Sequence, residues 1–285
     1  MKIRNAQRII QTTEVSEGAG VTVHRSIGTP ALRNLDPFLM LDHFGSDEPG
    51  EYIAGFPDHP HRGFNTFTYM LDGHMLHQDS MGNKGDLRSG GAQWMKAGSG
   101  VIHSEMPQQN EGLMRGFQLW INLPAKDKMS SPAYQEYSPE ALPVVETNGA
   151  HVRVLLGEYQ GVAGPIKDPL TQVEYYDIAI NGGQTFEHAI RCDLNSFIYL
   201  YEGTVHINGQ AISTHSLVVL GEGEQVEITA GAQNARFILV AGKPIGEPIV
   251  QYGPFVMNTQ TEIHQAMADY RDGTLVKERA EMIGE

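Results

Sequence analysis

Hydrophobic and polar residues alternate in short segments along most of this chain. These segments are rich in aromatic and β-branched residues, and turn residues such as Gly, Asn and Asp separate them about every 8–12 positions. The clearest examples are residues 66–73, 92–98, 116–123, 151–157, 174–180, 196–203 and 236–242. Alternation of this kind is typical of strands with one buried face. The sequence therefore predicts an all-β protein built of barrels or sandwiches.

One segment near the end of the chain has the period of a helix instead. Thr259 or Thr261 stands where a side-chain oxygen could accept hydrogen bonds from the first free backbone N–H groups. Four residues that follow would share one helical face: Ile263, Ala266, Met267 and Tyr270. We therefore expect one short C-terminal helix.

An internal repeat indicates how the strands are organised. Residues 67–73, FTYMLDG, have a counterpart 130 positions later in residues 197–203, FIYLYEG. Asn65 falls on Asn195 at the same offset, and a glycine turn that enters a strand recurs at an offset of 131. Several matches in register, each at a strand or a turn, indicate a duplicated domain.

The segment between the two copies is polar. Residues 123–142 contain three prolines, which is typical of a connection between domains. We expect an N-terminal barrel at residues 1–135 and a C-terminal barrel at residues 136–285, with the helix in the second. A chain of 285 residues is long enough to form two such cores without disulfides.

Histidines are concentrated in the first half of the chain. Five of the 12 lie between positions 59 and 103. The informative arrangement is His59-Pro-His61, followed 42 residues later by His103-Ser-Glu105. Residues i and i+2 of a strand point to the same face, so each pair can present two side chains to a barrel interior. Two such strands side by side would bring three imidazoles and one carboxylate together.

This set of donors has a chemical meaning. Three nitrogens and one oxygen suit Fe(II), Mn, Co, Ni, Cu or Zn rather than Ca or Mg. Four protein ligands on a six-coordinate metal leave two positions open, which suits a substrate oxygen and O₂. A structural zinc site would more often use cysteine, and this chain has only Cys192. His74 and His77 follow a turn at Gly73, and we interpret them as structural residues.

Both histidine stretches are similar to the two cupin motifs, with Gly98-Ser-Gly100-Val-Ile-His103 carrying glycine where the second motif has proline. Longer stretches resemble the pirin family: DPFLMLDHFG (36–45), DHPHRGFNTFTYMLDG (58–73), GDLRSGGAQWMKAGSGVIHSEMP (85–107), FQLWINLP (117–124) and YGPFVMNTQTEIHQAMADYRDG (252–273). The resemblance covers essentially the whole chain. It implies two tandem cupin-type jelly-roll β-barrels with a short C-terminal helix.

The resemblance also implies a metal site. The family's ligands fall on His59, His61, His103 and Glu105, with Fe(II) expected first and Mn, Co, Ni, Cu or Zn as alternatives. Pirins commonly keep a Glu where this chain has Asn65, and that Glu is not counted among the ligands. Five residues near the motifs are candidates for lining a substrate pocket, although Trp94 and Met106 suit the core equally: Phe56, Phe64, Met75, Trp94 and Met106.

Three functions are compatible with such a site. Some pirins resemble quercetin 2,3-dioxygenases, which implies cleavage of a small aromatic, flavonol-like substrate with O₂ and Glu105 as the catalytic proton acceptor. Others resemble regulatory proteins, in which the iron would sense redox state and act through a protein partner without catalysis. A metal-dependent isomerase is a third possibility, because cupin folds serve many chemistries.

The second copy is expected to lack a metal site. Offsets of 130 and 131 between the copies place four other residues at the ligand positions: Ala189, Arg191, Asn234 and Arg236. Two arginines would repel a cation, so the sequence predicts one metal centre, in the N-terminal barrel.

Overall charge narrows the classes of partner. Lys and Arg number 20 against 34 Asp and Glu, which gives a net charge of −14 with neutral His. Such a chain repels nucleic-acid phosphates and anionic membranes, and no run of Lys or Arg offsets this. The single cysteine and the absence of a long apolar stretch in residues 1–18 indicate a cytoplasmic protein. We expect no direct binding of nucleic acid or membrane.

Overall fold

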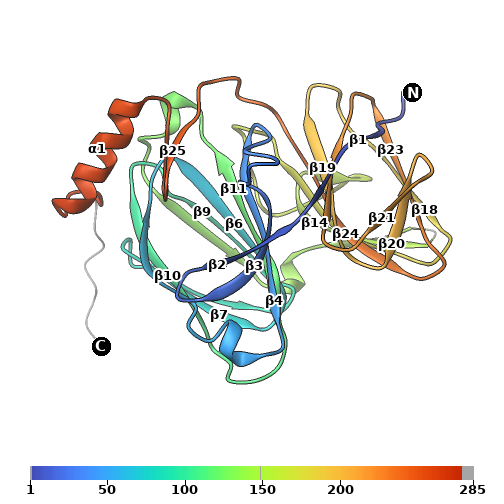
Figure 1. The fold of residues 1–285 in the computed structure, drawn as a ribbon, viewed down its shortest axis with the longest axis horizontal. Coiled ribbons are helices and arrows are strands. Elements are labelled where there is room, and N and C mark those ends of the chain that lie inside the picture. Colours follow the sequence, from blue (N-terminus) through green and yellow to red (C-terminus); the bar gives the residue numbers. More distant parts are fainter. Residues whose placement is uncertain (1, 148, 278–285) are drawn as a thin grey trace. The chain divides into compact units, whose positions relative to one another are not determined.

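The structure is a computed structural model, which describes residues 2–147 and 149–277. It consists mostly of strands, and one α-helix, α1 (Gln260–Arg271), follows them (Figure 1). The chain forms two compact units. We call them the N-terminal barrel, which contains Glu14–Arg25, Phe38–Pro139 and the chain from Ile245 onward, and the C-terminal barrel, which contains the chain up to Thr13, Ser26–Pro37 and Glu140–Pro244.

Two antiparallel sheets and a hairpin form the described part of the N-terminal barrel. The larger sheet has the order β12 (Ala133–Tyr137), β9 (Ala92–Lys96), β6 (Phe64–Asp72), β11 (Met114–Asn122), β4 (Phe38–Ser46), β3 (Val21–Ile27) and β2 (Thr13–Glu17). The smaller has the order β5 (Phe56–His61), β10 (Val101–Pro107), β7 (His74–Asp79) and β8 (Lys84–Arg88). The hairpin is β25 (Val250–Tyr252) with β26 (Phe255–Met257), and the short 3-10 helices are η1 (Pro49–Glu51) and η2 (Ala125–Asp127).

The C-terminal barrel repeats this arrangement strand for strand. Its larger sheet has the order β1 (Ala6–Gln11), β22 (Ser216–Leu220), β19 (Asn195–Glu202), β24 (Ala235–Gly242), β17 (Glu174–Ile180), β14 (Ala150–Leu156) and β13 (Val144–Thr147). The smaller has the order β18 (Thr185–Ala189), β23 (Gln225–Ala230), β20 (Thr204–Ile207) and β21 (Gln210–Ser213). The pair β15 (Glu158–Tyr159) and β16 (Val162–Ala163) and the 3-10 helix η3 (Pro139–Ala141) are additional. The predicted duplication and the all-β class are confirmed.

The two units do not follow the expected division at residue 135. Strand β1 pairs with β22 of the C-terminal barrel, where it covers a sheet edge that would otherwise be open. The chain after Ile245 belongs to the N-terminal barrel, so the helix lies in the first unit and not in the second. The expected connection at 123–142 also contains strand β12, which pairs with β9. The compact units are therefore not contiguous halves, because segments from the two ends of the chain pack into the opposite unit.

Helix α1 is capped by Thr259, one of the two predicted capping residues. The Thr259 side chain accepts from the Glu262 backbone N–H, and the Glu262 carboxylate accepts from the Thr259 N–H, which forms a capping box. Ile263 and Ala266 are buried. Met267 and Tyr270 share the predicted face but are 38% and 44% exposed, so the buried stripe is narrower than expected.

Buried polar contacts attach this last segment of the chain within the N-terminal barrel. The Arg62 guanidinium donates to the Ser99 carbonyl at 2.6 Å and forms an ion pair with Asp269 of α1 at 2.8 Å. Arg62 is almost fully buried, and its backbone bridges to Phe255 of β26. Because Arg62 follows His61 directly, its ion pair holds α1 next to the predicted metal site.

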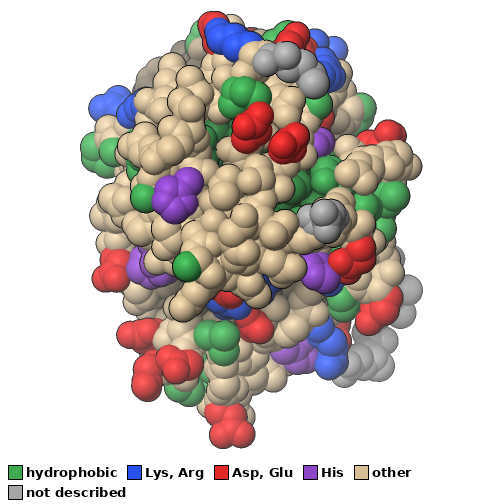
Figure 2. All heavy atoms as spheres, turned by 90° about the vertical axis from the view of Figure 1, so that its right-hand side faces the viewer, with side chains coloured by type: hydrophobic (Ala, Val, Ile, Leu, Met, Phe, Trp, Pro, Cys, Tyr) green, Lys and Arg blue, Asp and Glu red, His purple; other side chains and the backbone are tan. Residues whose placement is uncertain are grey.

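The surface agrees with the acidic composition. Figure 2 shows one face of the molecule, on which basic side chains lie in small separate groups among acidic ones. Among the described helices, none is long and apolar enough to span a membrane.

Candidate metal centre

Strand pairing brings the two histidine motifs side by side. His59 and His61 lie on β5 and His103 on β10, and these strands are neighbours in the smaller sheet of the N-terminal barrel. His103 pairs directly with His59, and Val101 pairs with His61. The register shifts between His103 and Glu105, which is the mark of a β-bulge.

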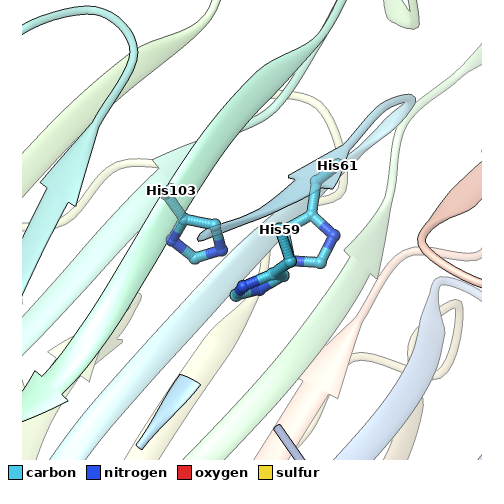
Figure 3. A group of neighbouring side chains, drawn as sticks. All are labelled: His59, His61 and His103. Atoms are coloured by element: carbon cyan, nitrogen blue, oxygen red, sulfur yellow. The ribbon is translucent and has the colours of Figure 1, made fainter. Parts of the chain in front are cut away.

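Three imidazoles converge at this point. One ring nitrogen from each of His59, His61 and His103 lies within 4.8 Å of the other two. Figure 3 shows the three rings turned toward one another, and the Nε2 atoms of His59 and His61 are 3.1 Å apart. His61 and His103 are 2% and 1% exposed. We call these residues the histidine triad.

The state of the rings fits a transition metal. Nδ1 of His59 lies 2.8 Å from the Pro57 carbonyl, which assigns its proton to Nδ1 and leaves Nε2 as the available ligand. Nε2 of His103 is buried and has no hydrogen-bond partner among the described residues. Burial, with the neighbouring imidazoles adding to it, lowers the pKa of both His61 and His103 well below the usual histidine range. Neutral imidazoles with unshared lone pairs are what a divalent transition metal requires.

Glu105 lies next to the triad through His103. Its carboxylate and one ring nitrogen each of His77 and His103 lie within 4.8 Å of one another, in a second group that shares His103 with the first. Glu105 is 3% exposed. The structure therefore brings the predicted His59, His61 and His103 into one group and places the predicted Glu105 beside it.

Neutral side chains surround the Glu105 carboxylate. Gln93 Nε2 donates to Oε1, and Gln118 Nε2 donates to Oε2 at 3.2 Å. The Thr68 hydroxyl lies 3.2 Å from Oε1. The sequence analysis did not identify these three residues. Each is a polar residue at a position of a strand that faces the barrel interior, and this is the signal that could have revealed them.

His77 also belongs to this region, although its sequence context indicated a turn residue. It is buried on β7, where its Nδ1 lies 3.5 Å from Nδ1 of His103. Its Nε2 lies 3.4 Å from Asp79, and the ring stacks on Tyr134 at 4.4 Å between centroids. His74, which shares the same turn, instead bonds Asp86 in a partly exposed position.

A cavity of about 590 Å³ opens beside the triad. His59, His61 and Glu105 contribute to its wall, as do the apolar side chains of Phe56, Met75 and Trp120. Two of the five predicted pocket residues, Phe56 and Met75, therefore line it. The other three lie outside its lining: Phe64, Trp94 and Met106. Phe64 is fully buried and packs on Trp120.

The wall of this cavity is acidic. It carries the carboxylates of Glu105 and three other acidic residues, and Arg25 is the only Lys or Arg among the described residues that line it. Arg25 is already paired with Asp42 at 2.6 Å and with Glu17 at 2.8 Å. Burial raises the pKa of Asp42, and the Arg25 guanidinium opposes this. The arrangement favours neutral ligands with hydrogen-bond donors over anionic ones.

Asn65 does not contribute to the cavity. It is 2% exposed on β6, where it pairs with Lys96 of β9 and Ile121 of β11. A buried position outside the cavity lining is consistent with a residue that is not a metal ligand.

The C-terminal barrel has different residues at the ligand positions from those expected. Pro107 pairs with Met75 as Ala230 pairs with Val205, so β10 and β23 align at an offset of 123. This register places four residues at the ligand positions: His188, Ile190, Val226 and Ile228. The expected Asn234 and Arg236 are wrong, since β24, which contains Arg236, is the counterpart of β11. Shorter loops before β23 changed the offset.

Comparisons with known proteins agree with this architecture. The Pirin family model matches residues 20–121, and the model of the pirin C-terminal cupin domain matches residues 175–276. A pirin-like protein of Caulobacter vibrioides is 46% identical over 96% of this chain and 99% of its own length. Pirin of Homo sapiens is 43% identical over 95% of this chain and 93% of its own. The chain belongs to the pirin family.

A solved structure extends this result to the fold. Quercetin 2,3-dioxygenase from Acinetobacter baumannii superimposes with a TM-score of 0.89 at 30% identity, over 96% of this chain and 98% of that one. The predicted pair of cupin domains is thereby confirmed.

Proposed function

We propose that this pirin binds one divalent transition metal in the N-terminal barrel and acts as a quercetin 2,3-dioxygenase-type oxygenase. The ligands are His59, His61, His103 and Glu105, and Fe(II) is the metal expected first. The observation that carries the proposal is the convergence of three imidazoles, of which His61 and His103 are buried and His59 and His61 line one cavity. We also propose a cytoplasmic location, because Cys192 is an exposed free thiol.

The cavity supports a small aromatic, flavonol-like substrate. Phe56 and Trp120 offer apolar surfaces to aromatic rings, and the carboxylates of the wall can accept hydrogen bonds from phenolic hydroxyls. A neutral polyphenol meets both requirements. The volume of about 590 Å³ lies within the range of small-molecule sites.

Each part of the site has a role in this reaction. A bound metal of this class supplies a site at which a substrate oxygen and O₂ can be activated together. Glu105 accepts the proton of the phenolic hydroxyl, since its carboxylate faces the cavity. Phe56, Met75 and Trp120 exclude water from the reacting groups.

The test is anaerobic reconstitution with Fe(II), followed by measurement of O₂ uptake and carbon monoxide release on addition of quercetin. We expect stoichiometric consumption and release by the wild type and neither by His59→Ala. His188→Ala is the matched control, because His188 occupies the position of His59 in the C-terminal barrel. Bound iron without turnover would contradict the oxygenase and favour the regulatory alternative, in which the oxidation state of the iron controls a protein partner.

A further inference from the structure

Three polar residues form a straight row across the larger sheet of the N-terminal barrel. Gln93 of β9 pairs with Thr68 of β6, and Thr68 pairs with Gln118 of β11. Gln93 and Thr68 are each 1% exposed. All three reach the Glu105 carboxylate on the opposite sheet. We call Gln93, Thr68 and Gln118 the donor row.

Hydrogen bonds within the donor row fix the direction of both amides. The Thr68 hydroxyl has one proton, and its shorter contact is with Gln118 Oε1 at 2.6 Å. Gln118 therefore presents its Nε2 to Glu105 Oε2. Gln93 Nε2 donates to Glu105 Oε1 and, at 3.1 Å, to the Thr68 hydroxyl oxygen, which accepts because its own proton points to Gln118.

This arrangement leaves part of the carboxylate available. An ionised carboxylate has about four lone-pair positions, and the two amides occupy one on each oxygen. The remaining positions are free to face the triad or a substrate in the cavity. The donors are neutral, so they orient Glu105 without a cation that would compete with a bound metal.

The C-terminal barrel shows that the fold does not require such a row. With residues 67–73 aligned on 197–203, strand pairing places Val218, Ile198 and Leu239 at the three positions. Ile228 stands in place of Glu105. All four are fully buried in one apolar core. Burying two amides and a hydroxyl costs free energy unless they are hydrogen-bonded, so the row is best explained by what it holds.

We propose that the donor row consists of positioning residues that hold the Glu105 carboxylate in the direction required for metal binding. The inference rests on the metal site proposed above and adds three residues to it. Thr68 and Gln118 also line the cavity, and of these two it is Gln118 whose amide donates to Glu105.

The experiment measures Co(II) affinity by competition with a chelator, together with the visible spectrum of the Co(II) protein. Gln118→Met keeps the volume of the side chain and removes its donors. We expect its Co(II) affinity to fall about 10–100-fold, the usual effect of losing a residue that orients a ligand. Gln78→Met, at an exposed position of β7, is the control and should match the wild type.

Repeating the Gln118→Met substitution in the Glu105→Ala protein separates an effect on the orientation of Glu105 from a general structural effect. In Glu105→Ala, the carboxylate that Gln118 orients is absent, so adding Gln118→Met should change affinity and spectrum little. Equal losses in both backgrounds would overturn the inference, because Gln118 would then act independently of Glu105. Unchanged affinity of Gln118→Met in the wild-type background would overturn it as well.

Thr68→Val is expected to fold normally, because the C-terminal barrel has the β-branched residue Ile198 at this position. Loss of the hydroxyl frees Gln118 Oε1, and we expect a smaller loss of affinity in the same direction. A wild-type protein that binds no Co(II) would overturn the metal site itself, and the inference with it. Binding by the wild type with no effect of either substitution would overturn the inference alone.

Discussion

The two barrels share one strand order but have opposite interiors. In the C-terminal barrel, a single apolar cluster draws on both sheets and includes Ile198, Val218, Leu239 and Ile228. In the N-terminal barrel, the corresponding positions carry Thr68, Gln93, Gln118 and Glu105, and a cavity lies beside them. One copy of the fold therefore uses its interior for packing, and the other uses it for a polar centre.

The difference shows what a buried polar centre requires. Aliphatic side chains pack without partners, whereas each polar side chain in the N-terminal barrel needs a specific neighbour to offset its loss of hydration. Glu105 has such neighbours in Gln93 and Gln118, and His77 has them in Asp79 and Tyr134. A metal centre on this fold therefore involves many more residues than its ligands.

The largest expected effect is on the function of the N-terminal barrel. Glu105→Ala removes a proposed ligand and proton acceptor, so we expect weaker metal binding and a loss of oxygenase activity of about 10²–10⁴-fold or more. Metal content and O₂ uptake measure the two effects. Glu111→Ala, at an exposed position, is the control. Full metal occupancy with unchanged turnover would remove Glu105 from the site.

The same position in the C-terminal barrel should affect stability instead. Ile228→Ala leaves a cavity in a closely packed core, and we expect the free energy of unfolding to fall by about 2–5 kcal/mol. Urea denaturation measures this loss. Metal content per chain should stay the same in folded protein. A loss of metal from folded Ile228→Ala would show that the two interiors are not independent.

A pH effect on stability is expected from the N-terminal barrel. Burial lowers the pKa of Lys128 to about 8, and its Nζ donates to the Gly63 and Val256 carbonyls and to Asn122. The unfolded chain then binds the proton more tightly, so stability should rise with pH between about 8 and 10.5, by roughly 3 kcal/mol at most. Urea denaturation at pH 8 and pH 10 measures this. Lys128→Met should lose this increment, and a wild type with falling stability over the range would contradict the assignment.

The smallest effect is expected at Arg191. It pairs with Asp193 at 2.6 Å in an exposed position, so Arg191→Ala should change the free energy of unfolding by less than about 1 kcal/mol. Metal content should be unchanged, because Ile190 rather than Arg191 occupies the position of His61. If this variant lost half of its metal, the C-terminal barrel would have to contain a site of its own.

The fold could be predicted because its signals are local. The repeat at 67–73 and 197–203 lies on β6 and β19, which are counterparts, and the two His-x-His and His-x-Glu motifs lie on paired strands. A constant offset failed beyond these strands, since the loops of the two copies differ in length. The packing of α1 against the N-terminal barrel could not be predicted, because Arg62 is distant in sequence and its ion pair with Asp269 leaves no periodic signal.

The donor row could not be recognised from the sequence. Gln93 and Gln118 are glutamines on strands, and the direction of each side chain depends on register, which only pairing with Thr68 reveals. The sequence context of His77 led to a different interpretation from its structural position. Its neighbours in sequence indicate a turn, whereas its contacts with His103 and Asp79 come from tertiary packing.

The exchange of terminal segments between the barrels has a consequence for biosynthesis. Gln251, Gly253 and Pro254 form part of the cavity wall, and Asp269 closes the ion pair beside His61, yet all four are synthesised well after the proposed ligands. A ribosome that has made the first 139 residues has produced every proposed ligand without the segment that completes their surroundings. The surroundings of the ligands therefore form only after the segment from Ile245 has been made and has packed into the N-terminal barrel, later than the ligands themselves.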